Sequence, residues 1–347
     1  MEYRVEPTGP SLRLPDIEDT PIGQESMFAD LDAAAPSALL TSRFVVPPFS
    51  VLDGRAGYWQ ERKAQWLALG IQSEIGRGDV TPTGDATSYR KAADERSNLT
   101  GASALPEWAT NGTALMASGT SIFDPVLCEI AYRWFCPPGG TVLDPFAGGS
   151  VRGIVAAMLG HRYLGVDLSP EQVAANRAQA DVLLAGGDYY PPVWVQGDSA
   201  NINRLLAADH QTDLLFSCPP YYDLEVYGDS PGELSAMSTY EEFLRAYRLI
   251  IGLAAQRLRP DRFAVWVVGE VRDKHGFQRG LVPDTIRAFQ NAGMRLYNEA
   301  VLINQVGTLA LRAPRAFIGG RTLGRTHQAV LVFWNGTKRP AWKPLDA

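Results

Sequence analysis

From about Ser118 onward, hydrophobic residues recur in two alternating patterns. Short apolar runs that end in Gly, Asp or Ser are typical of buried parallel strands, and longer segments with apolar residues every three or four positions are typical of helices. Strands are predicted at residues 141–146, 162–169, 192–199, 212–218, 262–271, 294–304 and 328–334. Helices are predicted at residues 121–136, 151–160, 170–185, 239–258 and 283–293. This alternation predicts an α/β fold with a mostly parallel, seven-stranded sheet that helices cover on both faces.

The last two predicted strands have no predicted helix between them. One of the two is therefore expected to run antiparallel, at the end of the sheet. Their connection, residues 305–326, is longer than a hairpin needs and is expected to be a loop. This loop contains no acidic residue and four arginines, which are Arg312, Arg315, Arg321 and Arg325.

The first part of the chain lacks the regular pattern. Residues 1–46, rich in Pro, Asp and Ser, are expected to form an irregular arm. Residues 47–110 are expected to hold an aromatic-rich helix around Trp59, which packs on the rest or helps to define a target, followed by a loop. The main α/β unit is expected at 111–337, and residues 338–347 form a tail.

Composition limits the class of protein. The chain has 347 residues, of which 46% are hydrophobic and 20% charged, as in globular proteins. It shows neither a leader-like pattern nor a long apolar segment, so a cytoplasmic location is expected. The three cysteines, Cys128, Cys136 and Cys218, lack CxxC spacing, so neither disulfides nor a metal site are expected.

Charge is unevenly distributed along the chain. The net charge is −6, and residues 1–100 contain ten Lys or Arg against fifteen Asp or Glu. Residues 274–343 contain eleven basic residues against two acidic ones. The arginines of 305–326 therefore suit contacts with phosphates and guanine, although pairing with the acidic N-terminal arm is an alternative.

Three successive strand ends contain groups suited to a ligand. The stretch "LDPFAGGS", Leu143 to Ser150, predicts a strand, a turn of small residues and a helix N-terminus, where backbone can approach a ligand closely. The next two strands end at Asp167 and Asp198. Because ligands of open parallel sheets bind outside the carboxyl ends of the strands, a site is predicted there, with Asp167 at the position that commonly binds a ribose. A helix cap is the alternative for either aspartate.

The stretch "SCPPY", residues 217–221, follows a buried strand. Two consecutive prolines forbid regular structure and fix the direction of the neighbouring carbonyl groups. The stretch is either a rigid element of the site or simply a buried turn. Cys218 also allows a third interpretation, a thiolate that adds to a pyrimidine ring.

The pair "DPFAGGS" and "CPPY" resembles the two signature motifs of the S-adenosylmethionine-dependent DNA amino-methyltransferases. The chain looks most similar to phage-type DNA methylases, over residues 118–335 and more loosely over 47–78. The resemblance implies a Rossmann-like class I methyltransferase fold, with S-adenosylmethionine as cofactor. It implies double-stranded DNA with a flipped base as partner, a role in DNA methylation or restriction-modification, and a bacterial host cell.

The resemblance also implies a set of cofactor-binding residues. Phe146 is implied to pack near the cofactor, Gly148 and Gly149 to lie beneath its methionine part, and Asp198 to hold the adenine. The full implied set is Thr120, Asp124, Asp144, Phe146, Gly148, Gly149, Asp167 and Asp198. One departure is Ser150, which stands where the family usually has a second glycine.

The catalytic residues implied by the second motif are Ser217, Cys218, Pro219, Pro220 and Tyr221. In the family, a side chain and a proline carbonyl accept hydrogen bonds from the amino group, while the aromatic ring stacks on the flipped base. Cys218 is a departure because the family has Asp, Asn or Ser at that position, and a thiol is a weak acceptor. Ser217 or Asp223 could supply the oxygen instead, and Tyr222 is expected to bind substrate.

Several functions stay open on the sequence alone. Methylation of adenine N6 is slightly favoured over cytosine N4, on the likeness to phage methylases. An RNA or protein-glutamine methyltransferase is an alternative, as is a catalytically impaired DNA-binding relative. The covalent mechanism is disfavoured because the families that use it have Pro-Cys, the reverse order. The oligomeric state is undecided.

Overall fold

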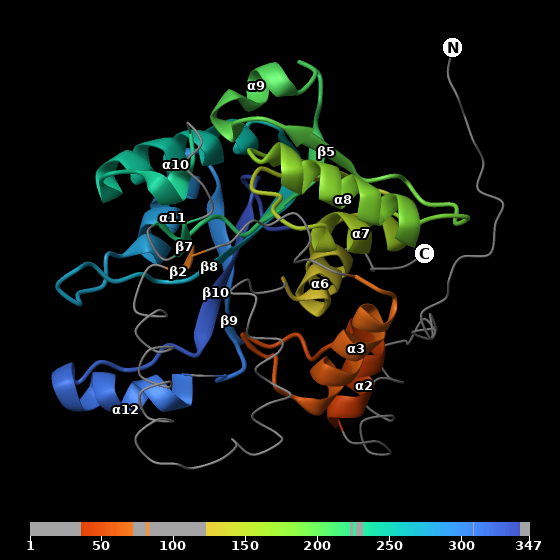
Figure 1. Ribbon diagram of the computed structural model, residues 1–347. Coiled ribbons are helices and arrows are strands. Elements are labelled where there is room, and N and C mark those ends of the chain that lie inside the picture. Colours follow the sequence, from red (N-terminus) through yellow and green to blue (C-terminus); the bar gives the residue numbers. More distant parts are fainter. Residues whose placement is uncertain are drawn as a thin grey trace.

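The computed structural model describes residues 36–71, 81–82, 123–222, 225–226, 232–307 and 309–340 (Figure 1). An eight-stranded sheet has the strand order β1-β9-β10-β8-β6-β3-β4-β5. Its strands are β1 (Val51–Asp53), β3 (Thr141–Asp144), β4 (Arg162–Asp167), β5 (Val193–Gln196), β6 (Thr212–Ser217), β8 (Leu258–Val268), β9 (Arg295–Ile303) and β10 (His327–Trp334). A separate two-stranded sheet pairs β2 (Thr81–Pro82) with β7 (Glu225–Val226).

The sheet is mostly parallel, which confirms the predicted α/β, Rossmann-like class. β3 lies between β4 and β6 and is parallel to both, and β6 is parallel to β8. β10 is antiparallel to both of its neighbours, β8 and β9. Two details differ from the sequence prediction. The antiparallel strand lies inside the sheet, and the main sheet has eight described strands, because β1 of the N-terminal segment pairs in parallel with β9 and covers its edge.

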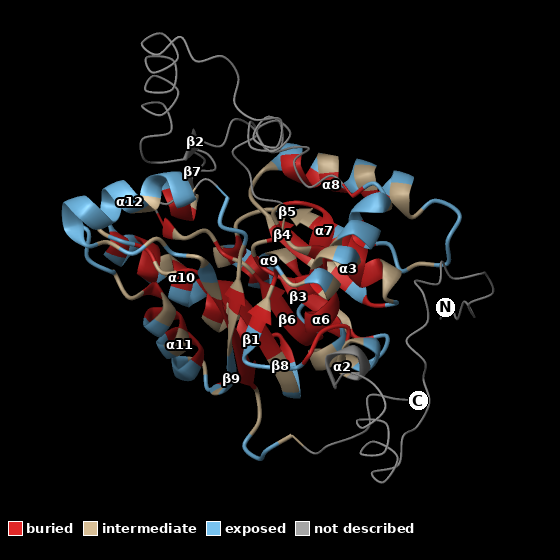
Figure 2. Ribbon diagram, turned by 90° about the horizontal axis from the view of Figure 1, so that it is seen from below, coloured by how far each residue is buried: buried red, intermediate tan, exposed pale blue. Residues whose placement is uncertain are grey.

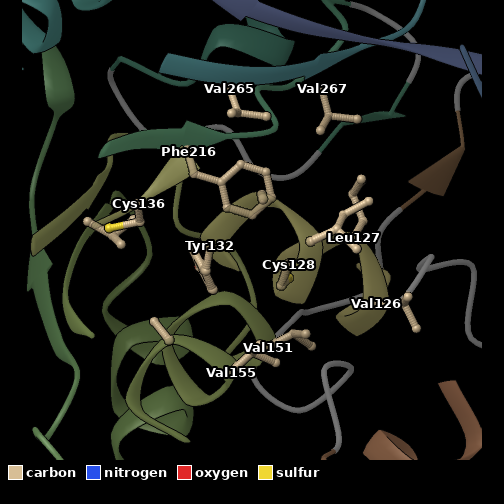
Figure 3. Packing of buried hydrophobic residues seen from close by; sticks show 14 of the residues in the cluster. Val126, Leu127, Cys128, Tyr132, Cys136, Val151, Val155, Phe216, Val265 and Val267 are labelled. Atoms are coloured by element: carbon tan, nitrogen blue, oxygen red, sulfur yellow. The ribbon is translucent and has the colours of Figure 1, made fainter. Parts of the chain in front are cut away.

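Helices cover both faces of the sheet. The α-helices of the described residues are α2 (Pro36–Phe44), α3 (Gly57–Ala68), α6 (Pro125–Phe135), α7 (Val151–Met158), α8 (Pro170–Leu183), α9 (Ile202–Leu205), α10 (Tyr240–Ala255), α11 (Leu281–Asn291) and α12 (Leu309–Gly320). Alternate residues of β6 show the two faces: Phe216 joins the core beneath α6 and α7, and Leu215 joins the core beneath α10 and α11. Figure 3 shows Phe216 among the α6 side chains, with the Tyr132 ring 5.4 Å away.

Two helices form where irregular chain was expected. α2 occupies the end of the predicted N-terminal arm, whose residues up to 35 lie outside the described residues. α12 occupies the predicted loop 305–326, and it contains Pro314 and no buried residue. Figure 2 shows α12 as an almost wholly exposed helix. A core-facing stripe is the signal by which helices are recognised, and α12 has none in its fold.

The predicted helix around Trp59 is α3, and it packs on α6. Trp59 and Trp66 are both fully buried. Glu129 of α6, also buried, accepts hydrogen bonds from Arg62 (2.6 and 2.8 Å) and from Trp66 Nε1 (2.7 Å). Burial alone would raise the pKa of Glu129, but the bonds and charge of Arg62, the Trp66 N–H and the charge of Arg133 together outweigh burial and lower the pKa. Packing, one of the two roles considered for this helix, is therefore confirmed.

Candidate active site at the carboxyl edge of the sheet

Asp144, the last residue of β3, joins the two sequence motifs. Its carboxylate is fully buried. Oδ1 accepts hydrogen bonds from the Phe146 backbone N–H (3.1 Å) and from Ser217 Oγ (2.5 Å), 73 positions away. Oδ2 accepts from Arg152 Nε (2.5 Å) and Tyr163 OH (2.8 Å). The turn after β3 and the end of β6 are thus attached to one carboxylate.

Arg152 of α7 supports the same turn. Its Nη2 donates to the carbonyl oxygens of Phe146 and Ala147, and its guanidinium lies 4.5 Å from the Phe123 ring centroid. Burial lowers the pKa of Arg152, but the adjacent Asp144 carboxylate together with Tyr163 and Cys218 raises it by more, so the side chain stays charged. Sequence reasoning missed this residue. The available signal was an arginine in the otherwise apolar segment "VRGIVAAM".

Gly148 and Asp167 meet at the carboxyl ends of β3 and β4. Gly148 has a φ of 51°, which suits glycine, and its N–H donates to Asp167 Oδ2 (2.7 Å). Its carbonyl oxygen accepts from Asn176 Nδ2 of α8 (2.7 Å). Asp167 Oδ1 accepts from the Ser169 backbone N–H (2.9 Å). The turn therefore has a defined conformation that presents backbone groups beside a carboxylate.

Ser150 fits the turn without a second glycine. Its buried hydroxyl donates to Gln179 Oε1 of α8 (2.5 Å). Gly153, one turn further along α7, lacks room for a side chain because a Cβ there would collide with the Trp194 ring. Gly153 therefore serves close packing of α7 on the sheet rather than the ligand turn.

The third strand end lies against the same turn. Asp198 Oδ1 accepts from the Ala200 backbone N–H (2.8 Å), and the neighbouring Ser199 Oγ donates to the Pro145 carbonyl (2.6 Å). A Cβ on Gly232 would lie 2.9 Å from Asp198 Oδ2. The structure thus brings together the ends of β3, β4 and β5, as expected from a parallel sheet.

Tyr221 is held by three elements. Its OH lies 3.3 Å from Cys218 Sγ and accepts a hydrogen bond from Gln328 Nε2 of β10 (2.9 Å). One edge of its ring faces Gly269, just after β8, where a Cβ would lie 2.9 Å from ring Cε2. Pro219 is buried and Pro220 partly buried. The aromatic ring therefore has a fixed position at the carboxyl edge, and Gln328 and Gly269 were not among the predicted residues.

Two residues predicted to contact substrate are turned inward instead. Ser217 is fully buried and its hydroxyl donates to Asp144, so it is not placed to accept a hydrogen bond from a substrate. Tyr222, with a φ of 52° and 5% exposure, packs on Tyr240 and Phe243 in the core. Tyr222 thus packs on α10, whereas the OH of Tyr221 bonds to Gln328 of β10.

Asp124 is likewise engaged elsewhere. Its Oδ1 accepts from the Val126 N–H and caps α6, while Oδ2 accepts from Trp59 Nε1 (3.2 Å) and Lys63 Nζ (3.0 Å) of α3. This carboxylate joins α3 to the N-terminus of α6, which is a contact other than the predicted cofactor contact. Thr120 and Asp223 lie outside the described residues.

The predicted substrate arginines lie at the same edge of the sheet. Arg312, Arg315, Arg321 and Arg325 are exposed on α12 or just after it. Because β10 is antiparallel to both β8 and β9, the strands β8 and β9 run in the same direction. α12 follows the carboxyl end of β9, so it lies at the same edge of the sheet as Tyr221. In the described ranges, no group of His, Cys, Asp and Glu could hold a metal ion, and no helix is long and apolar enough to cross a membrane.

No protein-family model and no curated protein matches the chain. Similar solved structures include TrmN from Thermus thermophilus, with 18% identity and a TM-score of 0.41, covering 65% of this chain and 52% of that one. Magnesium protoporphyrin IX methyltransferase from Synechocystis PCC 6803, solved with bound SAM, has 14% identity and a TM-score of 0.40, covering 72% and 99%.

A third similar structure is another protein from Thermus thermophilus, described as a DNA modification methylase. It has 16% identity and a TM-score of 0.32, covering 43% of this chain and 54% of that one. This chain thus spans about half the length of two of the three proteins. All three scores are low, so the function must be argued from the geometry of the site.

Proposed function

We propose that the protein transfers a methyl group from S-adenosylmethionine to an exocyclic amino nitrogen of a flipped base in double-stranded DNA. The observation that carries the proposal is the buried Asp144 carboxylate, which attaches the "DPFAGGS" turn to the "SCPPY" segment. A reaction between a bound cofactor and a base needs the two binding elements at a fixed separation, and this contact supplies it.

The residues beside the turn suit S-adenosylmethionine. The Asp167 carboxylate lies at the end of β4, beside the Gly148 N–H, and a carboxylate at this position suits hydrogen bonds from ribose hydroxyl groups. The Asp198 carboxylate, at the next strand end, would accept a hydrogen bond from the adenine amino group. The partly buried Phe146 ring can contact the cofactor, and Gly148 and Gly149 let it approach the backbone. When bound, S-adenosylmethionine supplies an electrophilic methyl group.

The "SCPPY" segment would hold the acceptor nitrogen. Pro219 and Pro220 lack N–H groups, so carbonyl oxygens of this segment can accept from the amino group without competition. When both N–H groups of the amino group donate hydrogen bonds to these oxygens, the nitrogen lone pair becomes localised on the nitrogen. An attack on the methyl group requires this localised lone pair. Since Ser217 is occupied by Asp144, the backbone takes the larger share of this role, beside the weak acceptor Cys218.

Tyr221 would stack on the flipped base. Its ring is fixed by Gly269 and its OH by Gln328, so little conformational entropy is lost on binding. The exposed arginines of α12 favour a polyanion as the substrate. Adenine N6 remains slightly favoured over cytosine N4.

Transfer of a labelled methyl group to unmethylated genomic DNA tests the proposal, with mass analysis of the nucleosides. We expect N6-methyladenine or N4-methylcytosine from the wild type. Tyr221→Ala should lower the rate of methyl transfer by about 10- to 100-fold, which corresponds to the free energy of stacking one base on an aromatic ring. Tyr190→Ala is the matched control, because Tyr190 is partly exposed at the opposite edge of the sheet, and it should have no effect.

The variant Cys218→Ser distinguishes direct methyl transfer to an amino nitrogen from the covalent mechanism with a Cys218 thiolate. The proposal predicts activity in this variant because serine is the better acceptor. Formation of 5-methylcytosine that is lost in Cys218→Ser would establish the covalent mechanism instead. Label that appears in RNA or in protein, and not in DNA, would assign another substrate. Failure of the wild type to bind S-adenosylmethionine would overturn the proposal.

A further inference from the structure

A short hairpin connects β8 to α11 at the carboxyl edge. Arg272 and Gln278 are bridge partners across it. At its tip the Asp273 N–H donates to the Phe277 carbonyl (2.8 Å), and Asp273 Oδ1 accepts from the N–H groups of His275 and Phe277 (both 2.9 Å). These bonds lower the pKa of Asp273, and the bond from the Phe277 N–H has the largest effect. The tip is therefore held in one conformation by its own backbone.

The base of the hairpin is fixed by Glu270. Its Oε1 accepts from the N–H groups of Val271 (3.1 Å), Gly280 (2.9 Å) and Leu281 (2.8 Å), so one carboxylate ties both arms together. Val271 and Leu281 are buried. The Arg279 N–H donates to the Val271 carbonyl (2.9 Å). The hairpin is thus anchored in the core at its base and projects at its tip.

The hairpin has a defined position relative to the proposed catalytic motif. Gly269, directly before it, faces the ring of Tyr221. The Arg279 guanidinium on its second arm lies 5.0 Å from the ring centroid of Tyr222 and 5.2 Å from that of Tyr240. Both arms are therefore attached to the segment that would hold the target base.

The tip presents an aromatic ring among positive charges. Phe277 is 72% exposed, and the side chains of Arg272, Lys274 and His275 are exposed around it. The two acidic residues of the hairpin, Glu270 and Asp273, are occupied by backbone N–H groups. An exposed ring on a rigid tip with basic neighbours is complementary to stacked bases flanked by phosphates.

We infer that the hairpin of residues 270–280 is a second contact with the nucleic acid, in addition to α12. Phe277 stacks on a base of the duplex beside the target, and Lys274 contacts a phosphate. Glu270 acts as a positioning residue that holds this contact at a fixed distance from Tyr221. The inference rests on the proposed function and goes beyond it by assigning residues that neither sequence motif contains.

Fluorescence anisotropy with a labelled DNA duplex, measured without cofactor, tests this contact. Phe277→Ala should weaken the Kd about tenfold, and Phe277→Trp should restore it. Val182→Ala is the matched control, because Val182 is 75% exposed near the C-terminus of α8 at the opposite edge, and it should leave the Kd unchanged. Lys274→Ala should lower the slope of log Kd against log salt by about one.

The outcomes separate the hairpin from the proposed function. Wild-type binding that Phe277→Ala leaves unchanged would overturn the inference while methyl transfer still supports the proposed function. Absence of duplex binding by the wild type would also overturn it, and the nucleoside analysis would then decide the proposed function independently. A positioning role for Glu270 predicts that Glu270→Gln lowers kcat for methyl transfer more than it raises the Kd for DNA. Equal changes in both would contradict that role.

Discussion

Asp144 and Arg152 form an ion pair that is almost wholly withdrawn from solvent. The side chains are 0% and 5% exposed, and each makes further hydrogen bonds, with Tyr163 and with the turn carbonyls. A buried pair of this kind contributes little compared with an apolar pair of the same shape, but losing one partner leaves a charge uncompensated. The pair therefore matters chiefly for the geometry of the turn.

Arg152→Met should lower the free energy of unfolding by about 3–5 kcal/mol, because Asp144 would be left buried without its cation. Urea denaturation provides the measurement. The exposed Arg204 of α9 is the matched control, and Arg204→Met should change stability by less than about 0.5 kcal/mol. The double variant Asp144→Asn with Arg152→Met should be more stable than Arg152→Met alone. If it is less stable, the argument from an uncompensated charge is wrong.

At the scale of elements, the docking of α3 on α6 adds an N-terminal segment to the sheet. Two buried tryptophans and the ion pairs of Glu129 and Asp124 make this contact. β1, just before α3, then pairs with β9. The docking of α3 therefore places β1 beside β9, the strand that precedes α12.

The Glu129 contact predicts a pH dependence. Its pKa in the folded protein lies below the usual 4.5, so its stabilisation is fully present above that pH and is lost as the pH falls through the folded pKa. At neutral pH Glu129→Gln should be less stable by about 1–3 kcal/mol. Below about pH 5 the wild type should lose stability more steeply than the variant, as urea midpoints at pH 6 to 3 would show.

The exposed Glu61 of α3 is the matched control for that experiment. Glu61→Gln should leave both the neutral stability and the pH dependence close to those of the wild type. A Glu129→Gln variant with the same pH dependence as the wild type would show that this carboxylate contributes nothing to acid unfolding.

The elements differ in how far the sequence predicted them. The strands and helices of the main unit follow their periodic patterns, which are local and strong. Residues 305–326 are predicted as a loop because they connect two strands and are longer than a hairpin needs, and α12 forms there although Pro314 and two final glycines oppose a helix. The sequence pattern does not predict that β10 lies between β9 and β8, because the order of strands depends on which strands pair in the folded sheet.

At the scale of the whole molecule, charge is segregated. The net charge of −6 by itself disfavours DNA binding. The arginines of α12 and the basic tip of the hairpin, however, lie at the carboxyl edge of the sheet. A local positive surface determines contact with phosphates even when the net charge is negative, since interactions beyond about 8–10 Å are screened.

This segregation predicts a salt dependence. The double variant Arg312→Ala with Arg315→Ala should weaken DNA binding and lower the slope of log Kd against log salt by about two. Lys338→Ala with Arg339→Ala removes two exposed charges after β10, at the opposite edge, and is the matched control. If both double variants change the slope equally, the binding surface is not at the carboxyl edge.

The sequence by itself determined most of the strands and helices of the main unit, though not α12, together with the turn after β3 and the rigid "SCPPY" segment. These features depend on periodicity and on the local conformations of Gly and Pro, so neighbouring residues suffice to specify them.

The tertiary structure alone decided which groups face the site. It turned Ser217 to Asp144, Tyr222 into the core and Asp124 toward α3, and it brought Gln328 to Tyr221 across 107 positions. Each of these assignments depends on a partner from a different element. Such partners meet only when helices and strands distant in the chain pack together, and no local pattern in the chain encodes that meeting.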